Sequence, residues 1–336
     1  MGGRTRAALR IGERLGKLVA VSEPSATAMI RRLPGLREID RVEPLDGGFS
    51  PDEVLLAVTR GGARYVVRLA DASLFDRKRA EARFLDSLRA AGLRCPRVVD
   101  VGIAPDDERC YTIFEYLEGT LARDALPSLS PQQQERAGRT AGEQLRLIHA
   151  QAPPLPESGW RDRRRAKHER KRQALEKLQL RFDGQDRVDA YLEASWALLE
   201  ASPFRLQHDD FQPGNILIAR GAYAGVIDFG NWDGGDPVED FYKIPWLTAQ
   251  RWPPFARGQI DGYLAAGESH DFWRRYHLFI ALSLYSTLLW GAENGASLAE
   301  FETRSSEPHA AWLAGIAHIL ETHDFDGATP PRWYTD

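Results

Sequence analysis

The chain contains little cysteine and no long apolar run. Its 336 residues include only two cysteines, Cys95 and Cys110, which is too few for a disulfide framework. No stretch reaches the ~18–20 apolar residues of a membrane-spanning helix, and residues 1–21 lack the apolar core of a signal peptide. We therefore expect a cytoplasmic protein that does not associate with membranes.

The chain is also poor in lysine, which supplies six of its 44 basic residues. Its 48 acidic residues give a formal net charge of −4, so the overall charge does not favour a nucleic-acid partner. Hydrophobic residues make up 43% and charged residues 27% of the chain, as in ordinary globular proteins. Its length leaves room for two domains and a sizeable core.

Residues 207–240 form the most informative stretch. Asp210 and Asn215 lie five residues apart, and Asp228 follows thirteen residues later at the end of an apolar run, before Phe229-Gly230. Phosphoryl-transfer enzymes with a kinase fold place two magnesium-binding groups and a catalytic aspartate in this order. Magnesium prefers oxygen ligands such as the side chains of Asn215 and Asp228, which leaves Asp210 to orient or deprotonate the attacking hydroxyl. The spacing predicts an ATP-dependent kinase with Mg²⁺ as cofactor.

The residues around these three groups predict a loop followed by a hairpin. Pro213-Gly214 allows the chain to turn between Asp210 and Asn215. Residues 216–218 and 224–227 then have the composition of two short strands, with Arg220-Gly221 in the turn. We therefore expect the catalytic and metal-binding groups at strand ends.

Hydrophobic periodicity predicts the elements on either side of this stretch. The expected strands are 41–45, 53–59, 64–69, 98–101 and 110–115. The expected helices are 74–91, 131–150 with Ser130-Pro131 at its start, 161–200, 237–251, 255–266, 270–292 and 307–323.

These elements predict an α+β, protein-kinase-like bilobal fold. We expect a helical lead-in over residues 1–36 and a small N-lobe, an antiparallel sheet with one long helix, over 37–116. A larger, mainly helical C-lobe follows over 117–336, and it carries the catalytic loop and the acceptor-binding helices.

Several residues of the small lobe are candidates for nucleotide binding. Gly47, Gly48 and Ser50 join the first two strands, where backbone amides can approach phosphate. Arg68 lies near the end of the third strand, at the place of the phosphate-binding lysine of kinases, and Glu81 on the next helix can pair with it. An ordinary hairpin turn and two surface charges are the alternative interpretation.

The segment from Phe114 to Gly119 ends a strand just before the helical half of the chain. In a kinase-like hinge, the Glu115 carbonyl and the Leu117 amide contact the purine edge. A plain domain linker is the alternative, and the two interpretations are compatible. The nucleotide is expected to be ATP, with GTP as the alternative.

The motifs resemble those of the aminoglycoside phosphotransferase and choline kinase superfamily, over about residues 37–290. The shared pattern is His208-x-Asp210-x4-Asn215, Ile227-Asp228-Phe229, Gly235-Asp236-Pro237 and Asp240. The resemblance implies that Asp210 is the catalytic base and that Asn215 and Asp228 bind magnesium. It further implies that His208 braces the loop, and that Asp236 and Asp240 support the fold or the pocket wall.

Two positions depart from the pattern. Many members of the superfamily have glycine where this chain has Asp209, and protein kinases have lysine where it has Arg68. A second carboxylate next to Asp210 either attracts a cationic substrate or points to solvent. Arginine keeps the charge of lysine but not its geometry.

The family implies a small-molecule acceptor with a hydroxyl group. The acidic residues near the catalytic loop, which are Asp209, Asp233, Asp236, Glu239 and Asp240, with Glu293, Glu300 and Glu302 as additions, favour an aminoglycoside-type cationic antibiotic. The aromatic residues from Trp246 to Trp290 are compatible with a macrolide as the acceptor. Choline, homoserine, methylthioribose and sugars are further alternatives. A nucleotide-binding pseudokinase and a protein kinase are less favoured, and the sequence leaves the oligomeric state open.

The most basic segment is residues 161–172, RDRRRAKHERKR. We interpret it as the solvated face of a helix, because it lies outside the predicted catalytic loops. An anionic substrate and a nucleic-acid contact are the alternatives.

Overall fold

The computed structural model describes residues 28–45, 52–105, 108–265, 267, 271–294, 308–325 and 328–335. The chain forms two compact units, Met1–Asp76 with Val99–Glu115, and Arg77–Val98 with Tyr116–Asp336. The chain passes from the first unit to the second between Glu115 and Tyr116, and most of the long helix after the third strand belongs to the second unit.

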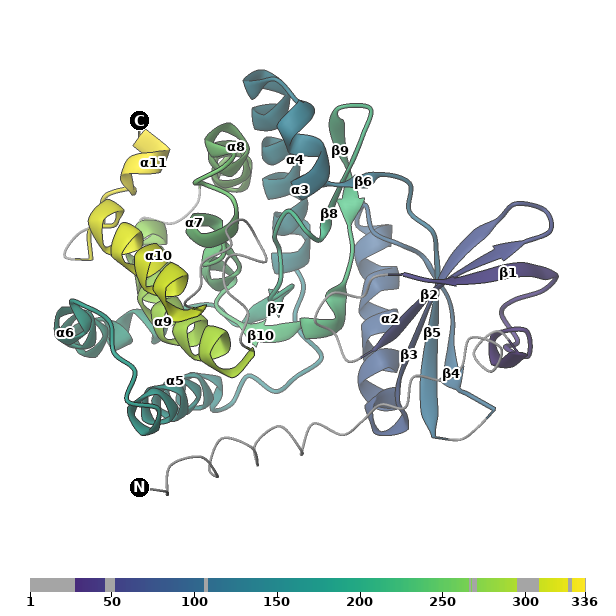
Figure 1. Cartoon of the computed structure of the whole chain (residues 1–336), viewed down its shortest axis with the longest axis horizontal. Helices are drawn as coiled ribbons and strands as arrows, with labels where there is room; N and C mark the ends of the chain where they lie inside the picture. The colour runs from purple at the N-terminus through teal and green to yellow at the C-terminus, as the bar shows by residue number, and fades with distance from the viewer. Residues whose placement is uncertain are drawn as a thin grey trace, which may run out of the picture. The chain divides into compact units, whose positions relative to one another are not determined.

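The first unit is built on a five-stranded sheet (Figure 1). Its strands are β1 (Ile39–Pro44), β2 (Glu53–Thr59), β3 (Arg64–Asp71), β4 (Val98–Ile103) and β5 (Arg109–Glu115), in the order β1-β2-β3-β5-β4. The pairs β1–β2, β2–β3 and β3–β5 are antiparallel. Apolar residues that alternate along β2 and β3, such as Leu55, Val67 and Leu69, are buried in the core of this unit. The predicted sheet and fold class are confirmed.

The segment before the sheet belongs to the same core. Ile30, Leu33 and Leu36 are buried against the apolar side chains of the strands. Of the predicted lead-in, residues 28–30 are helical, and residues 1–27 lie outside the described residues.

The second unit is mainly helical. Its helices are α2 (Phe75–Ala90), α3 (Ala122–Ala125), α4 (Pro131–His149), α5 (Trp160–Lys177), α6 (Gln185–Ser195), α7 (Ile244–Leu247), α8 (Pro253–Leu264), α9 (Phe272–Asn294), α10 (Pro308–Thr322) and α11 (Arg332–Thr335). Two small sheets accompany them, β6 (Thr120–Leu121) with β8 (Ile216–Ala219) and β9 (Ala222–Val226), and β7 (Arg205–Gln207) with β10 (Asp233–Gly235). Within the described ranges, no helix combines the length and hydropathy needed to cross a bilayer.

Helix α4 begins at the predicted cap. The Ser130 hydroxyl accepts the Gln133 amide at 3.3 Å, and the Gln133 side chain accepts the Ser130 amide at 3.0 Å. This capping box supplies partners to two amide groups that a helix start otherwise leaves unpaired.

Helices α4 and α8 pack closely through glycines. A Cβ atom at Gly142 would lie 2.0 Å from the Gln259 carbonyl oxygen, and one at Gly262 would lie 2.0 Å from the Arg139 carbonyl oxygen. Only glycine allows the two backbones to approach this far. The contact fixes the position of α4, whose last residue, His149, reaches the candidate site.

The predicted helix over 161–200 is interrupted. Gln179 and Gly184 have φ values of 56° and 81° between α5 and α6, and a left-handed residue cannot continue a right-handed helix. The predicted helix over 237–251 is likewise two shorter elements, the 3₁₀ turn η5 (Pro237–Phe241) and α7. Proline is the first residue of η5 and the second residue of α7, and its fixed φ favours the start of a helical turn at each place.

The β8–β9 hairpin turns at Arg220-Gly221, as predicted. Their φ values are 52° and 73°, and two consecutive positive φ angles are the requirement of a type I′ turn. Ile216 pairs with Val226 at the open end of the hairpin, so the residues that flank the hairpin, Asn215 and Ile227, come together there.

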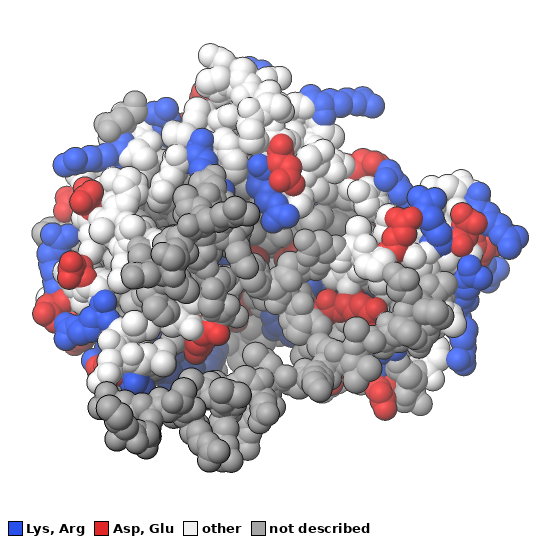
Figure 2. All heavy atoms as spheres, viewed as in Figure 1, with Lys and Arg blue, Asp and Glu red and all other residues white. Residues whose placement is uncertain are grey.

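On the face drawn in Figure 2, basic and acidic side chains are interspersed over the described surface. The overall charge of −4 therefore says little about any one site. The charge of a pocket has to be read from the side chains that line it.

Candidate active site

The Asn215 side chain is anchored on Asp210. Its Nδ2 atom donates to both the Asp210 backbone carbonyl and Asp210 Oδ2, each at 2.9 Å. These two bonds occupy both amide protons and direct the Asn215 Oδ1 atom away from Asp210. The contact with Asp210 therefore uses the amide nitrogen and not the amide oxygen.

Hydrogen bonds around Ile227 bring Asp228 to the same place. The Ile227 amide donates to the Asn215 carbonyl at 2.9 Å, and the Ile227 carbonyl lies 3.0 Å from His208 Nε2. The Asp210 amide donates to His208 Nδ1 at 3.2 Å, so Nε2 carries the imidazole proton and donates it to Ile227. His208 thus joins the two halves of the site as a brace.

The residue after Asp228 packs into the second unit. The Phe229 ring lies 4.5 Å from the His208 ring and 6.1 Å from the Phe84 ring of α2, measured between centroids. Asp228 itself has a φ of 63°, a left-handed conformation that aspartate tolerates better than most residues. The structure therefore brings together Asp210, Asn215 and Asp228, which the sequence predicted to act together.

The donor set fits magnesium. Asp228 supplies a carboxylate and Asn215 an amide oxygen, and magnesium is usually bound by one or two such protein groups together with phosphate oxygens and water. Among the described residues there is no cluster of three or more His, Cys, Asp or Glu side chains that could hold a metal ion. The pair Asn215 and Asp228 is therefore the candidate for a metal shared with a nucleotide.

A buried carboxylate holds the backbone of the catalytic loop. Asp240 Oδ2 accepts the His208 amide at 2.8 Å and lies 2.9 Å from His149 Nε2, while Oδ1 accepts the Asp209 amide at 2.7 Å. Burial raises the pKa of Asp240, but the hydrogen bond from His149 and the bond from the His208 amide outweigh it and lower the pKa. Asp240 supports the fold, as the resemblance implied.

Asp236, another of the acidic residues near the catalytic loop, is used within the protein. Asp236 is fully buried, and its oxygens accept bonds from Ser202 Oγ at 2.6 Å, from Arg275 Nη1 at 2.8 Å and from the Val238 amide at 2.9 Å. We therefore remove Asp236 from the substrate-binding candidates, because its carboxylate is used inside the protein.

Glu239 and Asp233 also have protein partners. Glu239 forms an ion pair with Arg164 and accepts a hydrogen bond from Gln207 at 3.3 Å. Asp233 begins β10 and accepts the Gly234 amide at 2.8 Å. Only Glu239 of these two lines the pocket described below.

Sequence reasoning missed Lys243. Its Nζ atom forms an ion pair with Asp210 Oδ1, and both side chains are largely buried, with 20% and 18% of their surface exposed. Burial lowers the pKa of Lys243, but the charges of Tyr242 and Asp210 raise it by more, so the pKa lies above its ordinary value. Lys243 and Asn215 thus hold the Asp210 carboxylate from its two oxygens. The signal in the sequence was a rare lysine three residues after Asp240.

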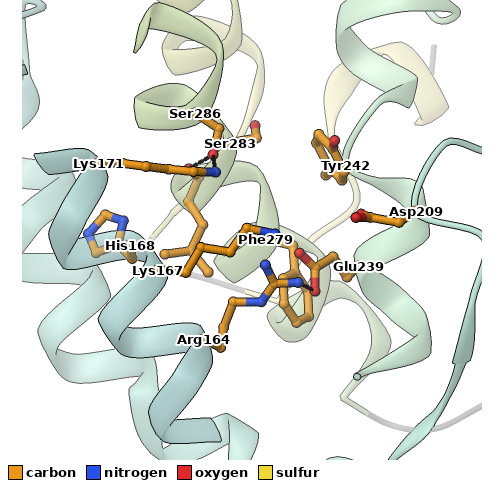
Figure 3. A pocket seen from close by; sticks show the side chains of 11 residues that line it. Arg164, Lys167, His168, Lys171, Asp209, Glu239, Tyr242, Phe279, Ser283 and Ser286 are labelled. Carbon is orange, nitrogen blue, oxygen red and sulfur yellow. Dashed lines mark hydrogen bonds and ion pairs between the residues drawn. The ribbon is translucent and has the colours of Figure 1, made fainter. Parts of the chain in front are cut away.

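A pocket adjoins the catalytic loop (Figure 3). Asp209 and Tyr242 line one side, and each is the chain neighbour of a residue in the Asp210–Lys243 pair. Phe279 and Leu282 of α9 form an apolar wall. Of the aromatic residues from Trp246 to Trp290 that left a macrolide acceptor possible, Phe279 lines this pocket, while Trp246, Trp252, Trp273 and Trp290 are not among the described residues of its lining.

The basic helix α5 lines the other side. Arg164, Lys167, His168 and Lys171 all face the pocket. Their spacing of three and four residues places them on one face of a helix. The interpretation of the whole basic segment as a solvated face was therefore wrong for this face, because α5 packs beside α9. The exposed face of α5 carries Arg163, Arg165 and Arg170.

The side chains of the pocket are partly desolvated. Burial lowers the pKa of His168 to about 4, so this imidazole is neutral near pH 7. Burial, together with the neighbouring Lys167 and Arg164, lowers the pKa of Lys171 to about 8. Burial raises the pKa of Asp209 although Lys167, Arg164 and Lys243 act against it.

Asp209 has a left-handed backbone. Its φ is 58°, the region that favours glycine. Glycine would adopt this conformation without the steric cost that a Cβ atom brings.

The nucleotide-binding candidates remain predictions. Arg68 lies on β3 with its Nη2 atom 3.4 Å from Asp52 Oδ2, and Glu81 is buried on α2. The two residues belong to different units, and so do the hinge candidates Glu115 and Leu117. Gly47, Gly48 and Ser50 lie outside the described residues.

The chain was compared with known families and structures. The model of the phosphotransferase enzyme family (APH) matches residues 41–278. A search of curated protein sequences gave no match.

Three solved structures illustrate the similarity of the fold. The GDP complex of wild-type aminoglycoside 2′-phosphotransferase-IIIa has a TM-score of 0.66 at 19% identity, covering 89% of this chain and 98% of that one. The gentamicin complex of APH(2″)-IIa has a TM-score of 0.60 at 18% identity, covering 90% and 97%. Amicoumacin kinase in complex with AMP-PNP, Ca²⁺ and its ligand has a TM-score of 0.65 at 16% identity, covering 94% and 97%.

Proposed function

Because the chain belongs to the phosphotransferase enzyme family, we propose that it transfers the γ-phosphoryl group of ATP to a hydroxyl group of a small molecule. The observation that carries this proposal is the network in which Asn215 is anchored on Asp210 while Ile227 ties Asp228 to both Asn215 and His208. The less favoured alternatives, a pseudokinase and a protein kinase, gain no support from a particular contact among the described residues.

Asp210 is the proposed general base. The acceptor oxygen attacks the γ-phosphorus, the bond from that phosphorus to the bridging oxygen breaks, and ADP leaves with the bonding electrons. The proton of the acceptor hydroxyl passes to the Asp210 carboxylate. Asn215 and Lys243 contact the two oxygens of this carboxylate and keep it from rotating.

Asn215 and Asp228 are the proposed magnesium ligands. When bound, magnesium neutralises phosphate charge and orients the γ-phosphoryl group. Complexes of the structural neighbours with GDP and with AMP-PNP support a nucleotide as the donor. ATP is the proposed donor, with GTP as the alternative.

Two acceptor classes are supported by different observations. The neighbours in complex with gentamicin and with an amicoumacin ligand support an antibiotic acceptor, such as the cationic aminoglycoside predicted from the sequence. The side chains of the pocket beside Asp210 support an anionic acceptor instead, as argued below. Both classes require the same chemistry at Asp210.

The test is ADP release with ATP and Mg²⁺ over acceptors of both classes, in the wild type and in Asp210→Asn. A general base contributes roughly 10²–10⁴-fold to a rate, so kcat should fall by about a thousandfold in the variant while nucleotide affinity changes little. Asp186→Asn, which alters an exposed ion pair with Arg181, serves as the control. Turnover in Asp210→Asn close to that of the wild type would refute the role of Asp210.

A further inference from the structure

The charges that face the pocket beside the catalytic loop differ from those expected for a cationic acceptor. Its lining contains three cations, Arg164, Lys167 and Lys171, and two carboxylates, Asp209 and Glu239. One cation and one carboxylate neutralise each other in the Arg164–Glu239 pair. The remaining charged side chains of the lining are therefore two lysines and one carboxylate, that of Asp209.

Both lysines line the pocket. Among the described residues, neither Lys167 nor Lys171 has a carboxylate oxygen within 4.0 Å. Lys171 Nζ donates to the Ser286 hydroxyl at 2.5 Å, which holds the ammonium group at the pocket without neutralising it (Figure 3). A partly buried ammonium group without a carboxylate is costly, and an anion would compensate it.

The position of the pocket relates it to catalysis. Asp209 and Tyr242 line it, and their chain neighbours Asp210 and Lys243 form the ion pair at the proposed base. The pocket measures about 80 Å³, while a single water needs roughly 10–15 Å³. A carboxylate or phosphate group with part of its carrier fits this space.

We infer that the acceptor carries an anionic group, a carboxylate or a phosphate, that binds Lys167 and Lys171 while its hydroxyl group faces Asp210. This inference rests on the proposed phosphotransferase function and specifies its substrate class. The apolar wall of Phe279 and Leu282 would pack against the carbon skeleton of the same molecule.

The first test measures the anion site without knowledge of the acceptor. Sulfate is titrated by calorimetry into protein whose nucleotide site is filled with AMP-PNP and Mg²⁺. We expect saturable binding that weakens about tenfold in Lys167→Met and in Lys171→Met, because each variant removes a charge-assisted contact. Lys171→Arg should restore most of the affinity.

Arg170→Met is the matched control, because Arg170 lies on the exposed face of the same helix and the variant makes the same charge change. It should leave sulfate binding unchanged, and thermal unfolding should show that every variant is folded. Absence of saturable sulfate binding, or equal weakening by Arg170→Met, would overturn the inference.

The second test is ADP release with glucuronate, glucose and glucosamine, which share a hydroxylated ring and differ in charge, and with gentamicin. Turnover that favours the anion, with KM raised about tenfold in Lys171→Met and kcat little changed, supports the inference. Turnover of cationic acceptors alone, with KM unaffected by the lysine variants, overturns it but keeps the kinase. Failure of the proposed function is separate, because it appears as turnover that does not depend on Asp210.

Discussion

The catalytic loop and the inner face of α5 lie at the same pocket, but their charged side chains differ in whether they have partners within the protein. The acidic residues around the loop are mostly satisfied within the protein, since Asp236 and Asp240 accept three hydrogen bonds each. On α5, Lys167 and Lys171 have no carboxylate partner within ion-pair distance among the described residues. Counting acidic residues near a motif therefore overestimates the negative charge that a substrate meets.

This contrast has a physical reason. A buried carboxylate must be hydrogen-bonded or paired, so acids that help to shape a loop are used by the loop itself. Lysine side chains are long, and they can keep an ammonium group at a pocket while their stems pack on the helix. The residues that give a site its shape and those that give it its charge are consequently different here.

The largest effect is expected where the loop depends on a buried acid. Asp240→Asn places an amide donor against the amides of His208 or Asp209, so it should reduce the free energy of unfolding by about 3 kcal/mol. Because the pKa of Asp240 lies below its ordinary value of 3.8, its stabilisation is present above that pH and lost as the pH falls through the folded-state pKa. Chemical denaturation at pH 7 and pH 3 measures both effects.

The exposed Asp186 provides the control for that measurement. Asp186→Asn removes a surface ion pair and should cost less than about 1 kcal/mol. If both variants lose the same stability, the catalytic loop does not depend on its buried acid and the comparison with α5 fails.

The next effect tests the proposed metal ligands. Asp228→Asn should weaken Mg²⁺-dependent nucleotide binding by about a hundredfold, because loss of even an outer partner of a metal ligand costs roughly 10–100-fold. Chelation of Mg²⁺ should weaken binding to the wild type in the same way and have little further effect on the variant. Calorimetry with AMP-PNP measures both. Unchanged affinity in Asp228→Asn would contradict the metal role.

The third effect tests whether the charge of Lys171 on α5 contributes to acceptor binding. Since the pKa of Lys171 is about 8, its charged form predominates at pH 7 and is mostly lost by pH 9. KM for an anionic acceptor should therefore rise about tenfold between these pH values. The side chains facing Lys171 are those of Lys167, Arg164, Asp209, Glu293 and the neutral His168.

Lys171→Arg shows whether the pH dependence of KM comes from Lys171 or from a neighbouring side chain. Arginine stays charged throughout this range, so the variant should show a nearly constant KM from pH 7 to pH 9. A wild-type KM that falls as the pH rises would indicate a cationic acceptor instead.

The smallest effect concerns Asp209, which belongs to the loop and lines the same pocket as α5. Asp209→Gly should stabilise the protein by about 1 kcal/mol, because a left-handed φ of 58° strains residues other than glycine. It should also lower KM for an anionic acceptor by removing the carboxylate from the pocket. Arg220→Gly, at another left-handed position, should change stability in the same direction without changing KM. Thermal unfolding and steady-state kinetics measure the pair.

Much of the architecture could be predicted because its signals are local. The strand over residues 53–59 was predicted with the bounds that β2 has, and Ser130 caps α4 as expected. Strand alternation, capping and turn chemistry act within a few residues. The interruption between α5 and α6 was missed, because the left-handed φ of Gln179 leaves little trace in the sequence, although Asp183-Gly184 is a turn signal that could have indicated it.

Spacing along the chain was enough to predict the kinase-like fold and the grouping of Asp210, Asn215 and Asp228, because a short loop and a hairpin connect these residues. Which charged side chains line the pocket depends on contacts between distant parts of the chain. The packing of α5 beside α9 turns Lys167 and Lys171 toward the pocket, and the pairing of Lys243 with Asp210 joins residues 33 apart in the chain. The physical reason is that helix periodicity defines a face, while only long-range packing decides what that face meets.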